Sequence, residues 1–344
     1  MQYKNLGACG VKVSELCLGT MMFGGPTPED ESLRIVAEAL DAGINFLDTA
    51  DKYNDGESER VVGKAIRNRR DEIVLATKVS LPTGEGPNDQ GSSRKHLRVG
   101  LEASLARLGT DYIDLYYLHK PDPDTPIEES LAALDDLVTA GKVLYVGCSN
   151  FWAWQIARAV GLQELRGWHR LVAVQPLYNL ANRDCEVELL PMCDELGLGV
   201  VSYSPIARGV LTGKYRPGHE PPPESRAGRG NERLMQTEYR DANFELAQQV
   251  VELAKEHGCT AAQLAVAWVK ANSLVSCPII GPRTMEQLED NLGALEVEIT
   301  PEIEAAVDEL VPPGEHSGHG FRDPSFPVMG RQAAGQEGAG TRPR

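Results

Sequence analysis

Short, mostly apolar runs alternate with longer amphipathic segments along most of the chain. The apolar runs have the length and composition of parallel β-strands that are buried on both faces. We expect eight strands, at Glu15–Gly19, Ile44–Asp48, Ile73–Lys78, Ile113–His119, Val143–Ser149, Leu171–Gln175, Gly199–Tyr203 and Cys277–Gly281. Eight strand-then-helix alternations predict an α/β fold, a closed (β/α)8 TIM barrel. An open doubly wound sheet is the alternative, because strand order cannot be read from a sequence.

The segments between the strands have helical periodicity and the usual helix boundary signals. Ser93–Leu108 places four leucines on one face, begins at serines that can cap it, and is followed by Gly109. Pro126–Gly141 has a proline near its start and a glycine at its end. Extra helices are expected at Phe244–His257 and Thr260–Ala271, after the seventh strand.

Two further segments fall outside the alternation. Tyr3–Val13, turning around Gly7–Gly10, predicts an N-terminal β-hairpin that plugs the bottom of the barrel. Arg208–Asn243 is a long loop after strand 7, rich in Pro, Gly and Arg, and loops of this length are often functional.

The chain is assigned one folded domain followed by a tail. Residues 1–311 form the barrel, and residues 312–344 form a C-terminal tail that is partly disordered, judging by its Gly, Pro and polar content. Within this tail, His316–Met329 carries Phe321 and Phe326. Two alternatives are weighed equally for that segment: it packs over the mouth of the barrel, or it is a loose tail.

Composition and charge narrow the class of protein. The 344 residues are 42% hydrophobic, enough for one large core, and α/β barrels routinely reach this size. A formal net charge of −16 argues against nucleic acid and membrane partners, so an anionic cofactor would need a local basic cluster. Seven cysteines without metal-like spacing indicate reduced thiols and no metal site. With no membrane-length apolar run and no signal-peptide pattern, we expect a cytoplasmic protein.

Polar residues stand where successive strands end. The second strand ends at Asp48 with Tyr53 in the next turn, the third ends at Lys78, and the fourth ends at His119. All strand ends of this kind meet at one rim of a barrel, where barrel active sites lie. Taken singly, each of these residues more often has a structural role, as a member of a buried ion pair or as a histidine whose hydrogen bonds are satisfied. Four in succession favour catalysis, because charged groups are rarely buried without partners.

The four side chains suit the reduction of a carbonyl group. That reaction needs a hydride donor and a proton donor at the oxygen, and Tyr53 would donate the proton. A free tyrosine has a pKa of about 10, which the Lys78 ammonium is expected to lower. Asp48 would hold Lys78 in place, and His119 would orient the carbonyl or relay the proton.

The chain resembles the aldo-keto reductases over roughly Met1 to Leu310. The matching motifs are LGTMMFG (18–24), GINFLDTADKYNDGESE (43–59), ATK (76–78), DLYYLH (114–119), GKVLYVGCSNF (141–151), QPLYN (175–179), YSPIARGVLTGKY (203–215) and PIIGPRTMEQLEDN (278–291). The resemblance implies a (β/α)8 barrel, NADPH or NADP bound without a Rossmann motif, a small carbonyl substrate, and a tetrad at Asp48, Tyr53, Lys78 and His119. It is strongest to bacterial reductases related to potassium-channel β-subunits. Asn54-Asp55 and Lys120 depart from the family pattern at the rim.

The resemblance also assigns cofactor contacts. Asp48 would lie beside the nicotinamide with Thr20 and Met21, its carboxamide would bind Ser149, Asn150 and Gln175, and Tyr203 would stack on its ring. The pyrophosphate would bind Ser204, Pro205, Ile206, Ala207, Arg208, Leu211 and Lys214. The adenosine end would contact Gly281, Arg283, Gln287, Asp290 and Asn291, with Arg283 on a 2′-phosphate, which favours NADP over NAD. Arg226 of the long loop would contact a phosphate. For Arg226 a solvated charge is weighed almost equally.

Two other functions are weighed beside carbonyl reduction. One is a redox-sensing, regulatory module that holds the cofactor with negligible turnover, against which the complete tetrad argues. The other is a Schiff-base aldolase, which needs a neutral Lys78 and is disfavoured by the adjacent Asp48. The physiological substrate and the oligomeric state stay open.

Overall fold

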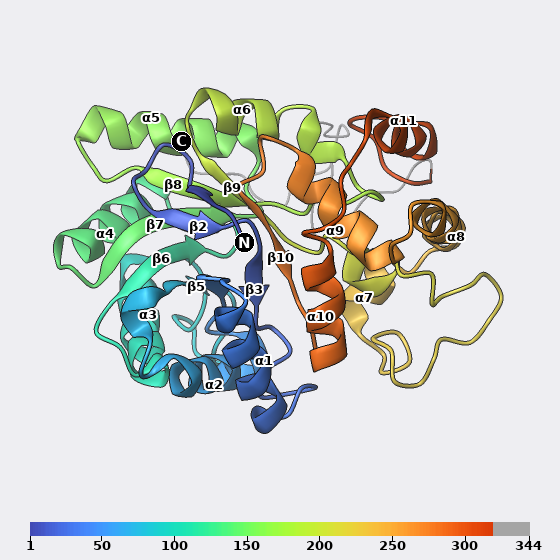
Figure 1. Ribbon diagram of the computed structural model, residues 1–344. Coiled ribbons are helices and arrows are strands. Elements are labelled where there is room, and N and C mark those ends of the chain that lie inside the picture. Colours follow the sequence, from blue (N-terminus) through green and yellow to red (C-terminus); the bar gives the residue numbers. More distant parts are fainter. Residues whose placement is uncertain (319–344) are drawn as a thin grey trace, which may run out of the picture.

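The computed structural model describes residues 1–318, and its centre is a closed barrel of eight parallel strands (Figure 1). The barrel strands are β3 (Cys17–Gly19), β4 (Phe46–Asp48), β5 (Val74–Val79), β6 (Ile113–Leu118), β7 (Val143–Ser149), β8 (Leu171–Gln175), β9 (Gly199–Ser202) and β10 (Cys277–Ile280). They pair in chain order, and β10 closes the barrel against β3. This confirms the predicted barrel and excludes the open sheet.

Helices surround the barrel (Figure 1). They are α1 (Glu29–Asp41), α2 (Glu57–Ile66), α3 (Arg94–Leu108), α4 (Ile127–Thr139), α5 (Ala153–Arg166), α6 (Leu189–Glu195), α7 (Glu232–Gln236), α8 (Asp241–Glu256), α9 (Ala261–Ala271), α10 (Met285–Gly293) and α11 (Pro301–Leu310). The predicted boundary signals act as expected: Ser93 accepts a hydrogen bond from the His96 amide, and Gly109 ends α3 with φ 65°. The long segment after β9 is not all loop, because it contains α7.

Two apolar layers hold the fold together. Strand residues alternate between them, so that on β5 Leu75 packs outward against the helices while Val74 and Ala76 fill the barrel interior. The interior also contains Phe46 and Tyr117, both fully buried. Because the barrel is filled by side chains, its floor is rigid, and function is left to the loops at the strand ends.

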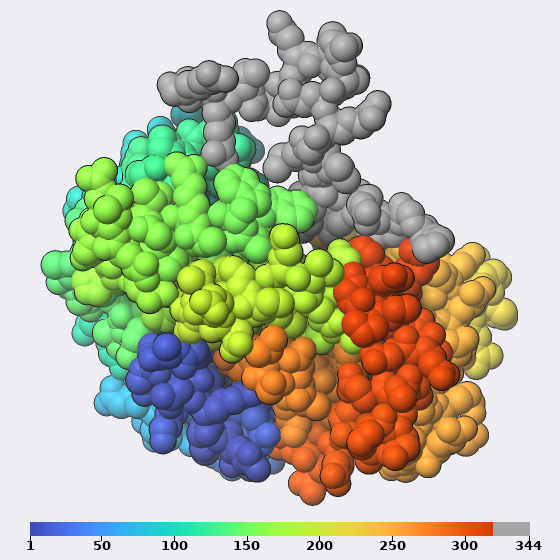
Figure 2. Space-filling model, turned by 90° about the horizontal axis from the view of Figure 1, so that it is seen from above, coloured from blue at the N-terminus to red at the C-terminus, as the bar shows by residue number. Residues whose placement is uncertain are grey.

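The N-terminal hairpin closes the bottom of the barrel, as predicted. Strands β1 (Tyr3–Asn5) and β2 (Lys12–Ser14) are antiparallel, and Leu6 with its neighbours packs into the barrel interior. The Ala8 amide donates to the carbonyl of Gly197 at 2.8 Å, and the Lys4 ammonium donates to the carbonyl of Val275. Figure 2 shows these dark blue residues against the yellow-green residues before β9 and the orange residues before β10.

The described start of the tail packs against the loop that follows β8. The Arg183 amide donates to the Glu315 carbonyl at 2.9 Å, and the Ser317 amide donates to the Ala181 carbonyl at 3.0 Å. The predicted domain boundary at residue 311 stays a prediction, and Phe321 and Phe326 lie outside the described residues. Within residues 1–318, none of the helices has the length and apolar character needed to span a membrane.

Gly7 is a position at which the backbone of the hairpin lies close to strand β9. It has φ +58°, and a Cβ there would lie 2.4 Å from the Gly199 nitrogen. Gly7→Ala is therefore expected to lower the free energy of unfolding by about 2 kcal/mol or more, from the left-handed backbone and the clash together. Denaturant unfolding measures this. Gly10→Ala is the control, since nothing lies within 4 Å of a Cβ there. If the two substitutions lowered the free energy of unfolding equally, close contact between the hairpin and the barrel at Gly7 would be contradicted.

Candidate active site

The carboxyl ends of the barrel strands open into a cavity of about 1340 Å³. Its wall includes Asp48, Tyr53, His119, Gln175 and Tyr203, which lie at or just after the ends of β4, β6, β8 and β9. The polar residues that the sequence places at successive strand ends therefore meet in one chamber. The parallel register of the strands is what brings them together.

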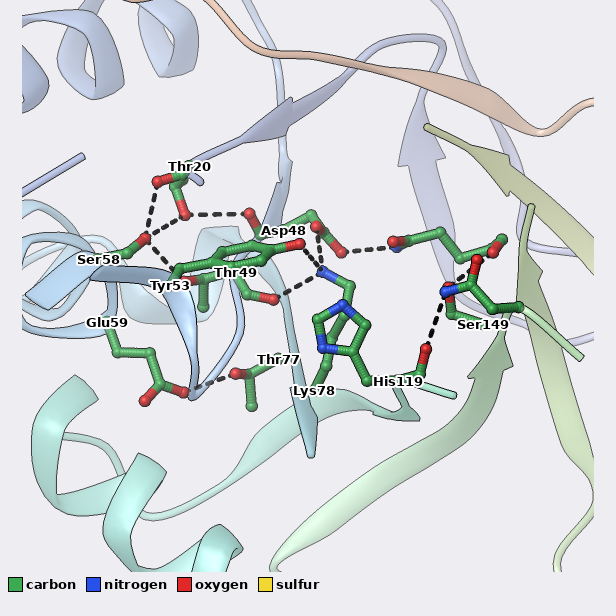
Figure 3. A network of polar contacts seen from close by, with 12 residues as sticks. Thr20, Asp48, Thr49, Tyr53, Ser58, Glu59, Thr77, Lys78, His119 and Ser149 are labelled. Carbon is green, nitrogen blue, oxygen red and sulfur yellow. Dashed lines mark hydrogen bonds and ion pairs between the residues drawn. The ribbon is translucent and has the colours of Figure 1, made fainter. Parts of the chain in front are cut away.

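Lys78 lies behind this wall and is fully buried. Its ammonium forms an ion pair with Asp48 and donates to the Thr49 carbonyl at 2.8 Å and to the Tyr53 hydroxyl at 3.2 Å (Figure 3). An ammonium has three donors, so each donor of Lys78 has one oxygen acceptor. The position of the charge is thereby fixed beside the phenol oxygen.

The pKa values around Lys78 differ in one respect from the expectation. Burial raises the pKa of Tyr53 above its ordinary value; Lys78 opposes this rise and Asp48 adds to it. Lys78 thus lowers the pKa of Tyr53 as expected, but desolvation of the phenolate outweighs the ammonium, so the net pKa is raised and not lowered. Burial by itself lowers the pKa of Lys78, but Asp48 and Tyr53 outweigh it and the net pKa is raised. At neutral pH this pair is an ammonium beside a protonated phenol.

His119 completes the group. Its ring stands edge-on to that of Tyr53, with centroids 5.9 Å apart and an interplanar angle of 81°. Burial, followed by the charges of Lys78 and Lys120, holds the pKa of His119 well below its usual range, so the imidazole is neutral. Its Nδ1 is buried and has no hydrogen-bond partner among residues 1–318. A neutral imidazole can orient a carbonyl by hydrogen bonding without adding a charge.

A second chain of hydrogen bonds leads from Asp48 across the strand ends. The Gln175 amide donates to Asp48 at 2.8 Å, and the Ser149 hydroxyl donates to the Gln175 carbonyl at 2.8 Å. The Asn150 amide donates to Ser149 at 3.0 Å and accepts from the Tyr203 hydroxyl at 2.9 Å. The residues predicted to hold a nicotinamide carboxamide thus form one connected network with the predicted tetrad.

A cationic cluster lies farther along the same cavity. It consists of Arg208, Lys214, Arg226 and Arg283, which all line the wall. Partial burial and then Arg283 and Arg226 lower the pKa of Lys214 to about 8. Burial and then Arg208 and Arg283 lower the pKa of Arg226 to about 10. Glu238 pairs with Arg208 at 2.9 Å. Positive charges that lower one another's pKa in this way fit a polyanionic ligand.

Most of the predicted cofactor residues lie on the cavity wall. The exceptions are Ala207 and Leu211, which are fully buried in the core and do not reach it. Trp152 and Trp154 also line the cavity and are 41% and 52% exposed. Lys120, one of the departures from the family pattern, also lines it.

Sequence reasoning missed a buried layer behind the tetrad. The Ser58 hydroxyl donates to the Thr20 carbonyl at 2.8 Å and lies 3.0 Å from the Thr49 hydroxyl (Figure 3). Glu59, fully buried, accepts from Thr77 at 2.6 Å and pairs with Arg107. Two signals were available: the motifs at 18–24, 43–59 and 76–78 contain these residues except Arg107, and Ser58 and Glu59 stand at the start of a helix. The second signal is also the pattern of an ordinary solvated first turn.

Comparisons with known proteins show the family of this chain. The Aldo/keto reductase family model matches residues 15–312. The chain belongs to the aldo/keto reductase family. The reductases of this family act on small carbonyl substrates, generally with nicotinamide cofactors. An uncharacterised oxidoreductase of Bacillus subtilis (strain 168) is 41% identical over 91% of this chain and 96% of its own length.

Other relatives of this aldo/keto reductase carry two kinds of name. A probable voltage-gated potassium channel subunit beta of Oryza sativa subsp. japonica is 38% identical over 90% of this chain and 97% of its own length. Versiconal hemiacetal acetate reductase of Aspergillus parasiticus is 34% identical over 92% of this chain and 99% of its own length. Within residues 1–318 the reductase has no group of three potential metal-binding side chains, and its seven cysteines are unpaired thiols.

Asp51 gives the site a pH-dependent stability. Both of its carboxylate oxygens are buried without a hydrogen-bond partner among the described residues, while its amide donates to the Lys78 carbonyl. Burial and then Glu59 raise the pKa of Asp51 to about 7. The folded state therefore keeps a proton that the unfolded chain releases near pH 4, so ionisation destabilises the fold progressively from about pH 4 to about pH 7.

Asp51→Asn removes this titration. Relative to wild type, the variant's free energy of unfolding is expected to increase with pH, by up to a few kcal/mol between pH 4 and pH 8, at about 1.4 kcal/mol per pKa unit. Denaturant unfolding of both proteins across that range measures the difference. A difference that is the same at every pH would contradict the raised pKa.

Proposed function

We propose that this aldo/keto reductase reduces an aldehyde or ketone to the alcohol with NADPH, and that Tyr53 donates the proton. The observation that carries the proposal is the buried Lys78 ammonium, held by Asp48 and in hydrogen-bond contact with a phenol that lines the cavity. His119 lies edge-on to the same phenol. A proton donor, a group that stabilises its anion and a neutral orienting group therefore share one chamber.

The cavity fits the proposed cofactor at both ends. Ser149, Asn150 and Gln175 present amide and hydroxyl groups at the strand ends, where they would bind a carboxamide. The cationic cluster would hold the pyrophosphate and the 2′-phosphate, because its mutual repulsion is relieved by anions. When bound, the nicotinamide supplies the hydride that reduces the carbonyl carbon. The proposed preference for NADPH over NADH rests on Arg283 and Arg226.

The side chains around Tyr53 have distinct proposed roles in the proton transfer. Tyr53 holds its proton at neutral pH because its pKa is raised, and it donates the proton to the substrate oxygen as negative charge develops there. Lys78 stabilises the resulting phenolate at 3.2 Å, and Asp48 keeps the ammonium in place. His119 binds and orients the carbonyl as a neutral donor. Solvent then reprotonates Tyr53.

The same geometry argues against an aldolase. A Schiff base needs an accessible, neutral lysine, whereas Lys78 is fully buried behind the cavity wall. Its pKa is raised and its three donors face three oxygens. No second candidate function is favoured by an observation at this site.

Tyr53→Phe tests the proposed proton donor. We expect kcat for a reactive aldehyde to fall by at least about 100-fold, the usual contribution of general acid catalysis, while NADPH still binds. NADPH absorbance across a panel of carbonyl substrates measures kcat, and a fluorescence titration measures binding. Substantial activity in the variant would remove Tyr53 from the mechanism. Wild-type protein that binds NADPH but does not oxidise it in a single turnover with the aldehyde would instead point to a regulatory module.

Arg283→Ala tests the proposed contact to the 2′-phosphate. The KM for NADPH is expected to rise by about 10- to 100-fold, as for the loss of a hydrogen bond to a charged group, while the KM for NADH changes little. Arg216→Ala is the control, because Arg216 is an exposed arginine outside the cavity wall. An equal rise for the two cofactors would show that Arg283 does not distinguish them.

A further inference from the structure

The three residues that follow Tyr53 all have left-handed backbone conformations. Asn54 has φ 48° and ψ 42°, Asp55 has φ 53° and ψ 41°, and Gly56 has φ 89°. Asn, Asp and Gly are the residues that adopt this conformation most readily, and for other residues it costs about 1–2 kcal/mol each. The Asn-Asp-Gly sequence therefore permits a sharp reversal immediately after the proposed proton donor.

The side chain of Asn54 binds the neighbouring loop, which follows strand β3. Its amide nitrogen donates to the Met21 carbonyl at 3.0 Å and to the Phe23 carbonyl at 2.8 Å. Both partners are acceptors, so only the NH₂ end of the amide can satisfy them and the orientation of the side chain is fixed. These two bonds join the Tyr53 turn to the loop that follows β3.

The loop after β3 is shaped to receive this amide. Met21 and Met22 of the loop line the cavity. A Cβ at Gly25 would lie 2.4 Å from Oδ1 and 2.5 Å from Cγ of Asn54, so the absence of a side chain at Gly25 leaves the space that the amide fills. The fit is thus specific to a small residue on one side and an asparagine on the other.

We propose that Asn54 is a positioning residue that fixes Tyr53 relative to the Met21–Met22 wall of the cavity. The inference rests on the proposed role of Tyr53. Lys78 holds the hydroxyl end of Tyr53, whereas Asn54 holds the backbone immediately after it. With both ends held, the phenol keeps a constant distance from the part of the wall where a cofactor and a substrate meet. A shift of about 1 Å in such a group can cost 100-fold in rate.

Asn54→Gly removes the amide and keeps a residue that accepts the left-handed backbone. We expect kcat to fall by about 10- to 100-fold, while NADPH affinity, set mainly by the distant cationic cluster, stays close to wild type. Asp55→Gly is the matched control. It adds the same backbone freedom one residue later, at an 85% exposed side chain whose ion-pair partner is Lys52, and is expected to leave kcat near wild type. An Asn54→Gly enzyme with wild-type kcat would overturn the proposal.

Gly25→Ala tests the same contact from the other loop. Alone it displaces the Asn54 amide and is expected to lower kcat by about as much as Asn54→Gly. In the Asn54→Gly background the new methyl group enters the vacated space, so no further loss of kcat is expected. If the double variant lost kcat by the product of the two single reductions, the two residues would act independently and the proposal would be overturned. Wild-type activity separates the two hypotheses: an inactive wild type refutes the proposed function, whereas an active wild type with multiplying or absent effects refutes the role of Asn54 alone.

Discussion

The site depends on one buried charge. Lys78 is fully enclosed, and an ammonium in that position is tolerated only because each of its donors faces an oxygen. These oxygens belong to Asp48, Thr49 and Tyr53, which β4 and the turn after it deliver together. The contacts that stabilise the lysine ammonium are therefore the same contacts that position the phenol. Removing the carboxylate would leave an uncompensated charge in the core and would release the phenol as well.

The net charge of the chain and the local charge inside the cavity have opposite signs. The chain carries a net charge of −16, which keeps polyanions away from most of its surface. Inside the cavity the sign is reversed locally, because Arg208, Lys214 and Arg226 of the segment after β9 meet Arg283 of the loop after β10 there. Burial first, and neighbouring positive charges second, lower the pKa values of Lys214, Arg226 and Arg283, so this concentration of charge is unfavourable without an anion. Affinity for a phosphorylated ligand would arise from relief of that repulsion and is expected to weaken with salt.

The sequence was sufficient for features with a local signal. The eight apolar runs predicted the barrel, and the polar strand ends Asp48, Lys78 and His119 predicted where chemistry would gather. The features that the sequence could not predict depend on desolvation and on the direction of side chains. The sign of the Tyr53 shift follows from burial, which a neighbouring lysine in the sequence does not reveal. The inward packing of Leu211 within a motif of the family, and the unpaired carboxylate of Asp51, likewise need coordinates.

Backbone strain is confined to the functional end of the barrel. Among residues 1–318, the non-glycine residues with positive φ are Asn54, Asp55, Ser80, Asn150, Ser204, Ala207 and Arg208. Each follows the carboxyl end of a barrel strand, whereas the hairpin end contains none. For the serine, alanine and arginine residues among them, such conformations cost about 1–3 kcal/mol each and persist only when the surrounding structure holds them. The barrel core and the N-terminal plug must therefore stabilise a rim that is itself unfavourable. This separation lets the loops change their chemistry without changing the fold.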